Sequence, residues 1–307
     1  MKWLKKGLIY APDKSVWWQQ HYAMMPTPVY LSELNVIRIY FGTTDINKFG
    51  RTTFIDVDVN NPSRILNSPS NYILDLGKRG TFDDAGAVPS SIMEIDSKQY
   101  LYYVGFQRTQ GVPYMLYTGL SYSSDWRNFV KFSEAPIIDR NSFNILSNAA
   151  PHVVYDIHNR VYRMWFWVGK EWVDVNNKLY INAEINTAKS NNGTDWDIDP
   201  IPCIIPDKET EFSVGRPWVI QADGVYKMFY SIRYIEKLYR LGYAESIDGI
   251  VWQRKDNEIG IDVSKEGWDS EMICYPAVIT VKGKTYLFYN GNNNGETGFG
   301  YAELIEE

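Results

Sequence analysis

Two carboxylates occupy the same place in two similar stretches of the sequence. Asp84 and Glu271 each stand five residues ahead of a proline, Pro89 and Pro276. Pro276 opens the β-branched apolar run Pro-Ala-Val-Ile, and Pro89 opens the similar phrase Pro-Ser-Ser-Ile. Acidic residues form strands poorly, so their position predicts a site beside a buried strand. Two carboxyl groups, one protonated and one ionised, are the equipment for cleaving a glycosidic bond.

The residues around each acid suggest how the roles divide. We predict Glu271 as the general acid, because the stretch EMICYP surrounds it with apolar neighbours that favour the protonated form. Asp84 would then be the base or nucleophile, backed by Asp83. His21 holds the equivalent place in another repeat. The alternative for each acid is a turn cap that accepts backbone N–H bonds.

The elements that must position these residues come from a repeat. The phrase Pro-x-x-(Val/Ile) occurs five times, at intervals of 63, 62, 66 and 59 residues. A second, aromatic-rich strand follows each phrase, then a third strand, and several third strands end in Ser-x-Asp-Gly-x-x-Trp or a similar turn sequence. The five prolines are Pro26, Pro89, Pro151, Pro217 and Pro276.

Four short antiparallel strands repeated five times predict an all-β fold, a five-bladed β-propeller. We expect a single domain over residues 1–307, with blades starting near the five prolines. The last repeat lacks a fourth strand, so residues 3–10 are expected to complete blade five and close the ring. Six blades, or a sandwich with coincidental spacing, are the alternatives.

Propeller connectivity brings the residues before each first strand and after each second strand to one funnel. The mixture there suits a polyhydroxylated ligand, since amides, carboxylates, guanidiniums and rings all bind sugars. Arg216 could instead pair with an acid, Trp218 could pack, and His152 could be a hydrogen-bonded wall residue. The predicted substrate-binding residues are His21, Asp45, Arg108, His152, Arg216, Trp218, Arg233 and Asn290.

Composition limits the partners and the compartment. The net charge of −6 argues against nucleic-acid binding and against an anionic membrane surface. No apolar stretch has the length of a membrane span or a signal-peptide core. Cys203 and Cys274 make neither a disulfide framework nor a zinc pattern, which favours buried thiols and a cytoplasmic location. The 15% aromatic content is expected to serve mainly sheet packing.

The architecture resembles the five-bladed carbohydrate enzymes, namely glycoside hydrolase family 43, its invertase and levansucrase relatives, and the family 130 phosphorylases. The phrases S-x-D-G-x-x-W and Y-x-M-x-Y-S-x-R are also similar to propeller proteins encoded near surface-polysaccharide genes. The family 43 resemblance implies three acids. The first phrase, HYAMMPTP, lacks the Asp, and the third, SNAAPHVV, lacks the Glu. Only Asp83 and Asp84 stand near an expected acid.

The leading hypothesis is a carbohydrate-active enzyme of the hydrolase or phosphorylase type. The alternatives are a biosynthetic enzyme for surface glycans that uses a nucleotide-linked or acidic sugar, and a non-catalytic glycan-binding propeller. Arg216 and Arg233 could clamp a carboxylate or phosphate. The expected ligand is a saccharide or nucleotide-sugar, without a cofactor. No metal ligands are predicted, although a carboxylate-bound divalent ion in the channel stays open.

Overall fold

The computed structural model describes residues 1–68 and 70–306, and it is built almost entirely of β-strands. The pairings group the strands into five antiparallel sets of four. The first two sets are β2 (His21–Leu31), β3 (Val36–Thr44), β4 (Gly50–Asp58) and β5 (Ile65–Asn67), then β6 (Gly86–Ile95), β7 (Lys98–Arg108), β8 (Tyr114–Ser123) and β9 (Val130–Lys131).

The other three sets repeat this order. They are β10 (Ser147–Asp156), β11 (Val161–Val175), β12 (Lys178–Ser190) and β13 (Asp197–Ile198); β14 (Glu211–Ala222), β15 (Val225–Tyr234), β16 (Arg240–Ser246) and β17 (Gln253–Arg254); and β18 (Cys274–Val281), β19 (Lys284–Asn290), β20 (Phe299–Glu306) and β1 (Lys2–Tyr10). Two short turns of helix, η1 (Asp256–Glu258) and α1 (Asn292–Gly295), complete the elements.

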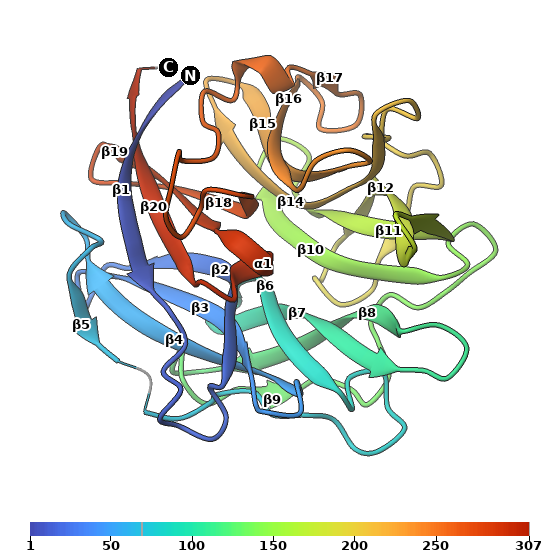
Figure 1. Cartoon of the computed structure of the whole chain (residues 1–307), viewed down its shortest axis with the longest axis horizontal. Coiled ribbons are helices and arrows are strands. Elements are labelled where there is room, and N and C mark those ends of the chain that lie inside the picture. Colours follow the sequence, from blue (N-terminus) through green and yellow to red (C-terminus); the bar gives the residue numbers. More distant parts are fainter. Residues whose placement is uncertain (69, 307) are drawn as a thin grey trace.

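The first strands of the sets form a closed ring. Strands β2, β6, β10, β14 and β18 contact one another in that order, and β18 returns to β2. Figure 1 shows the sets arranged around this centre. The β-propeller prediction is confirmed. We interpret each set as one blade, and the single domain of five blades stays a prediction.

The last set is completed from the other end of the chain. Strand β1 pairs antiparallel with β20, and Figure 1 shows the two termini side by side. Trp3 on β1 is buried, and its indole Nε1 donates to the carbonyl of Ile259 at 2.8 Å. The predicted pairing of the N-terminal segment is therefore confirmed, and it leaves no open edge between the two ends of the chain.

Aromatic rings make up much of the core. Of the twelve largest fully buried side chains, eleven are aromatic, so sheet packing takes many of the rings that the composition supplies. Phe41 and Phe288 share one cluster between neighbouring sets, and Tyr102 and Phe166 share another. Full burial of each such ring contributes about 1.5–3 kcal/mol. The described residues contain no helix that is long and apolar enough to cross a membrane.

Candidate functional site

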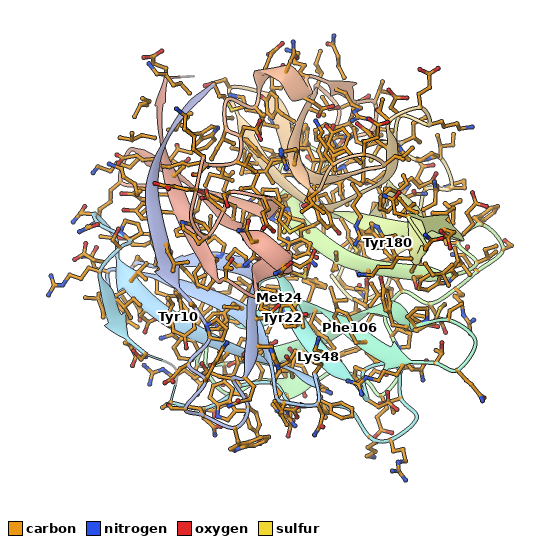
Figure 2. The ribbon with its side chains drawn as sticks, in the orientation of Figure 1. Tyr10, Tyr22, Met24, Lys48, Phe106 and Tyr180 are labelled. Carbon is orange, nitrogen blue, oxygen red and sulfur yellow. The ribbon has the colours of Figure 1, made fainter. Side chains whose placement is uncertain are left out.

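A cavity of about 490 Å³ opens where the first strands begin and the second strands end. This volume lies in the range of small-molecule sites. Figure 2 shows Tyr22, Met24 and Phe106, which line the cavity, near the centre of the ring, whereas Tyr10 lies farther out. The aromatic residues of the lining are Tyr22, Phe106, Tyr114, Trp167, Tyr239 and Tyr275.

One position of the repeat supplies a lining residue from every set, namely the residue just before the proline. In four sets the first strand has a bulge at this position, whereas in β6 the bulge lies one residue after the proline. The backbone of the four residues at these bulges is left-handed, with φ between 48° and 56°. The five residues are Met25, Val88, Ala150, Arg216 and Tyr275. In the four sets with a left-handed residue, the bulge turns the side chain toward the cavity.

The charge of the lining has one sign. Lys48, Arg108, Arg216 and Arg233 line the cavity, and within residues 1–68 and 70–306 neither Asp nor Glu does. This positive wall stands in a protein whose net charge is −6. A cleft lined by one sign of charge concentrates ligands of the opposite sign.

Arg216 is the most confined of these cations. It is only 2% exposed, and its Nη2 donates to the carbonyl of Pro26 at 3.3 Å and to Thr27 Oγ1 at 3.2 Å. Its Nε and Nη1 atoms have no hydrogen-bond partner among the described residues. Burial lowers the pKa of Arg216 to about 9. The sequence leaves open that Arg216 pairs with an acid in the funnel. This alternative is wrong, because no Asp or Glu among the described residues forms an ion pair with Arg216.

His152 and Trp218 lie behind this arginine. The rings of His152 and Trp218 have centroids 4.2 Å apart, and the guanidinium of Arg216 lies 5.1 Å from the Trp218 ring centre. His152 Nδ1 accepts the backbone N–H of Val219 at 3.1 Å. Burial first, and the nearby Arg216 second, hold the pKa of His152 well below its usual range. His152 is therefore a neutral wall residue. Neither it nor Trp218 lines the cavity.

Arg233 lies among aromatic rings. Its guanidinium carbon is 4.7 Å from the ring centre of Tyr180, 5.4 Å from that of Phe212 and 4.7 Å from that of Tyr239. No hydrogen bond or ion pair joins the Arg233 side chain to another described residue. Stacking restrains the guanidinium plane and leaves its N–H groups available to a ligand.

Two tyrosines connect this part of the wall to the next set. The rings of Tyr239 and Tyr275 contact each other, with centroids 5.9 Å apart. Burial raises the pKa of Tyr239 to about 12 and holds the pKa of Tyr275 well above its usual range. Both hydroxyls therefore keep their protons at neutral pH. Both tyrosines line the cavity, and a protonated hydroxyl can donate a hydrogen bond.

Asp83, expected beside the catalytic pair, belongs to a buried network instead. It is 1% exposed and accepts hydrogen bonds from Tyr103 Oη at 2.8 Å and from Thr81 Oγ1 at 2.9 Å. Lys131 Nζ lies 2.6 Å from its Oδ2. The carboxylate is saturated by these partners and does not line the cavity.

Asp84 occupies the turn that leads into β6. Its Oδ2 accepts the backbone N–H of Gly80 at 2.8 Å. This is the turn-cap alternative that the sequence leaves open. Asp84 does not line the cavity either. Its role as base or nucleophile therefore stays a prediction, and the composition of the lining does not support it.

Glu271 lies in the link before β18. Its backbone N–H donates to Asn292 Oδ1 at 2.9 Å, and its carbonyl accepts from Arg240 Nη1 at 3.0 Å. The prediction that apolar neighbours surround the Glu271 carboxyl is wrong. Met272 and Cys274 are buried, but Glu271 itself is exposed. An exposed carboxyl lacks the desolvation that would keep it protonated. The lining does not include it.

Three other predicted binding residues have partners within the protein. His21 Nδ1 lies 3.3 Å from Glu296, and Asp45 pairs with Arg51 at 3.1 Å. Asn290 is fully buried and binds the backbone of Met25, Ala23 and Gly298. None of the three lines the cavity. Of the eight predicted binding residues, the lining includes Arg108, Arg216 and Arg233.

Arg108 lines the cavity from another set, at the end of β7. It is exposed, and its guanidinium carbon lies 4.3 Å from the ring centre of Phe49. Among residues 1–68 and 70–306, no three His, Cys, Asp or Glu side chains gather as a metal site would require. Burial raises the pKa of both thiols, Cys203 and Cys274.

The family follows from a full-length relative. A Mycobacterium tuberculosis protein, "Uncharacterized protein Rv1502", is 32% identical over 304 residues, which cover 99% of this protein and 99% of the relative. This protein belongs to the Rv1502 family. No protein-family model matches it.

Solved structures place this member of the Rv1502 family in the β-propeller fold of glycoside hydrolases. A structure described as "Glycoside hydrolase" has a TM-score of 0.75 at 18% identity, over 98% of this protein and 90% of that one. A thermostable family-43 glycoside hydrolase has a TM-score of 0.69 at 16% identity, over 93% and 90%. The endo-arabinase of Bacteroides thetaiotaomicron VPI-5482 has a TM-score of 0.65 at 12% identity, over 98% and 99%. At these identities the likeness shows the fold alone.

Proposed function

We propose that this protein binds a saccharide in the central cavity. The observation that carries the proposal is the lining itself, which combines six aromatic rings with hydrogen-bond donors around a cavity of about 490 Å³. Rings pack against the C–H faces of a sugar, and Arg, Tyr and Gln side chains bind its oxygens. The names of the structural neighbours, glycoside hydrolases, support a carbohydrate ligand for this fold.

The reaction class expected from the sequence has less support. Hydrolysis by paired carboxylates needs two carboxyl groups facing the scissile bond, about 5–5.5 Å apart for retention or about 6.5–9.5 Å apart for inversion. No acidic residue within residues 1–68 and 70–306 lines this cavity. We therefore propose glycan recognition as the function, and any reaction at this site would use donors and cations in place of a carboxylate pair.

Binding is tested by calorimetry with a panel of monosaccharides and disaccharides. The variants Trp167→Ala and Tyr114→Ala each remove a ring from the lining, and Trp17→Ala removes a ring that is 60% exposed elsewhere. We expect at least tenfold weaker binding, about 1.4 kcal/mol, in both cavity variants and no change in Trp17→Ala. Sugar binding that survives both cavity variants would contradict the proposal.

The reaction class is tested separately with chromogenic glycosides. We expect that Asp84→Asn and Glu271→Gln leave any turnover by the wild-type protein within threefold of its value. A loss of a hundredfold or more in either variant, with folding intact by circular dichroism, would restore the paired-carboxylate mechanism.

A further inference from the structure

The positive charge of the cavity is concentrated where β14, β15 and β18 meet. Arg216 precedes Pro217 on β14, Arg233 lies near the end of β15, and Tyr275 is on β18. Tyr239 stacks on Arg233, and its ring contacts that of Tyr275 with centroids 5.9 Å apart. We call Arg216, Arg233, Tyr239 and Tyr275 the arginine wall.

Two donor atoms of the buried Arg216 side chain lack an acceptor among the described residues. An ionised group removed from water costs several kcal/mol unless it is paired and fully hydrogen-bonded. Arg216 is 2% exposed, its Nε and Nη1 have no acceptor among the described residues, and it lines the cavity. The folded protein therefore holds a desolvated cation whose remaining donors need an oxygen acceptor from outside the described residues.

Arg233 gives independent support from the neighbouring strand. Three rings surround its guanidinium within 5.4 Å, yet no acceptor of the described residues binds it. A guanidinium fixed in this way presents a planar fork of donors. This fork matches two oxygens of one carboxylate or phosphate group.

The hydroxyl groups of the wall add to the same preference. Tyr239 stacks on Arg233 and contacts Tyr275, and the raised pKa values of both tyrosines keep their hydroxyls protonated. Together with Lys48 and Arg108, the two arginines give the lining four cationic side chains. The described lining residues include no Asp or Glu. A neutral sugar would satisfy the hydroxyls but would leave the buried guanidinium uncompensated.

Resting on the proposed function, we propose that the saccharide carries a negatively charged oxygen group, a carboxylate or a phosphate, and that this group binds to the arginine wall. Its two oxygens would accept from the Arg233 fork and from the unpartnered donors of Arg216. The sugar ring would lie against the aromatic lining. The pairing of ligand anion and buried cation gives the selectivity for charged over neutral sugars.

The test compares sugars that differ in one charged group. Calorimetry measures glucose, glucuronate, glucose 6-phosphate and uridine diphosphate glucose, so that a carboxylate, a phosphate monoester and a nucleotide diphosphate are separate arms. We expect at least one charged sugar to bind tenfold or more tightly than glucose. Its affinity should fall at least threefold between 50 and 300 mM NaCl.

Substitutions in the arginine wall test whether it causes the preference for charged over neutral sugars. In Arg233→Gln and in Arg216→Gln, the ratio of charged to neutral affinity is expected to fall to within threefold of one. The matched control is Arg64→Gln, because the Arg64 side chain is 70% exposed on a distant turn. Arg233 has no bonded partner among the described residues, so its variant tests the proposal even where Arg216→Gln does not fold.

The outcomes separate the two proposals. Equal binding of glucose and all charged sugars would overturn the anionic subsite and support the saccharide site. Binding of inorganic phosphate that depends on Arg233, with no sugar bound, would support the subsite and contradict the saccharide site. Absence of binding by every probe would contradict both, and a preference that survives Arg233→Gln would overturn the arginine wall.

Discussion

Arg216 and Tyr275 hold the same place in neighbouring repeats, and both line the cavity. Each directly precedes the proline of a first strand, and their φ angles are 52° and 55°. Left-handed backbone at a non-glycine residue costs of order 1 kcal/mol or more, and such costs concentrate at functional sites. In four of the five sets, a left-handed residue directly before the proline therefore contributes its side chain to the lining of the cavity.

Replacing Arg216 by Met should stabilise the free protein. Met fills a similar volume without a desolvated charge, at the loss of two long hydrogen bonds of 3.2 and 3.3 Å. We expect the free energy of unfolding to rise by about 1 kcal/mol in urea denaturation. A decrease of more than about 1 kcal/mol would show that Arg216 serves the fold.

Binding of a charged sugar should weaken at high pH. Burial lowers the pKa of Arg216 from its ordinary value to about 9 in the folded protein, so the cation is lost as pH rises through 9. Calorimetry at pH 10 should give about tenfold weaker binding than at pH 7.5, since about a tenth of Arg216 is then protonated. Tyr239, with a pKa of about 12, stays neutral in this range. A flat profile would contradict the role of Arg216.

The same shift has the opposite effect on the free protein. As pH rises above 9, the unfolded state binds more protons at Arg216 than the folded state does, because the pKa is lowered only in the folded state. The contribution of this group to stability therefore rises with pH across that window. Urea denaturation at pH 8 and pH 10.5 gives the free energies of unfolding of the wild-type protein and of Arg216→Met. The stability advantage of Arg216→Met over the wild type should be smaller at pH 10.5 than at pH 8. A difference that stays constant would exclude a shifted Arg216.

The two neighbouring aspartates should differ in their effect on stability. Asp83→Asn breaks a buried ion pair with Lys131 and should cost about 3 kcal/mol, whereas Asp84→Asn weakens one turn bond and should cost less than about 1 kcal/mol. Denaturant midpoints with a common slope give both values. Equal costs would mean that the Asp83 network is not structural.

A substitution at Gly215 should displace the Trp167 ring, which lines the cavity. A Cβ at this position would lie 2.2 Å from Trp167 Cδ1, so Gly215→Ala must displace the Trp167 ring. We expect a loss of about 1–3 kcal/mol in stability and at least tenfold weaker sugar binding. Gly111→Ala is the control, because nothing lies within 4 Å of the methyl group that it would add. Equal behaviour of the two variants would contradict the position of Trp167.

The fold could be predicted from the sequence, because prolines, aromatic strands and turn residues recur together. All five prolines lie in first strands, and the N-terminal strand pairs with β20. The acids could not be placed in this way. Asp84 and Glu271 lie in links whose paths depend on turn caps and backbone bonds, and these are features of the folded structure. Strand alternation also misses the bulge that turns Tyr275 into the cavity, although its place before a repeated proline is visible in the sequence.

The most direct test is a crystal structure of the protein soaked with the charged sugar that binds most tightly. We predict density for the ligand in the central cavity, its ring against Trp167 or Tyr114 and its charged group within hydrogen-bond distance of Arg233. A sugar bound beside Glu271, or on the outer strands with an empty cavity, would contradict the account.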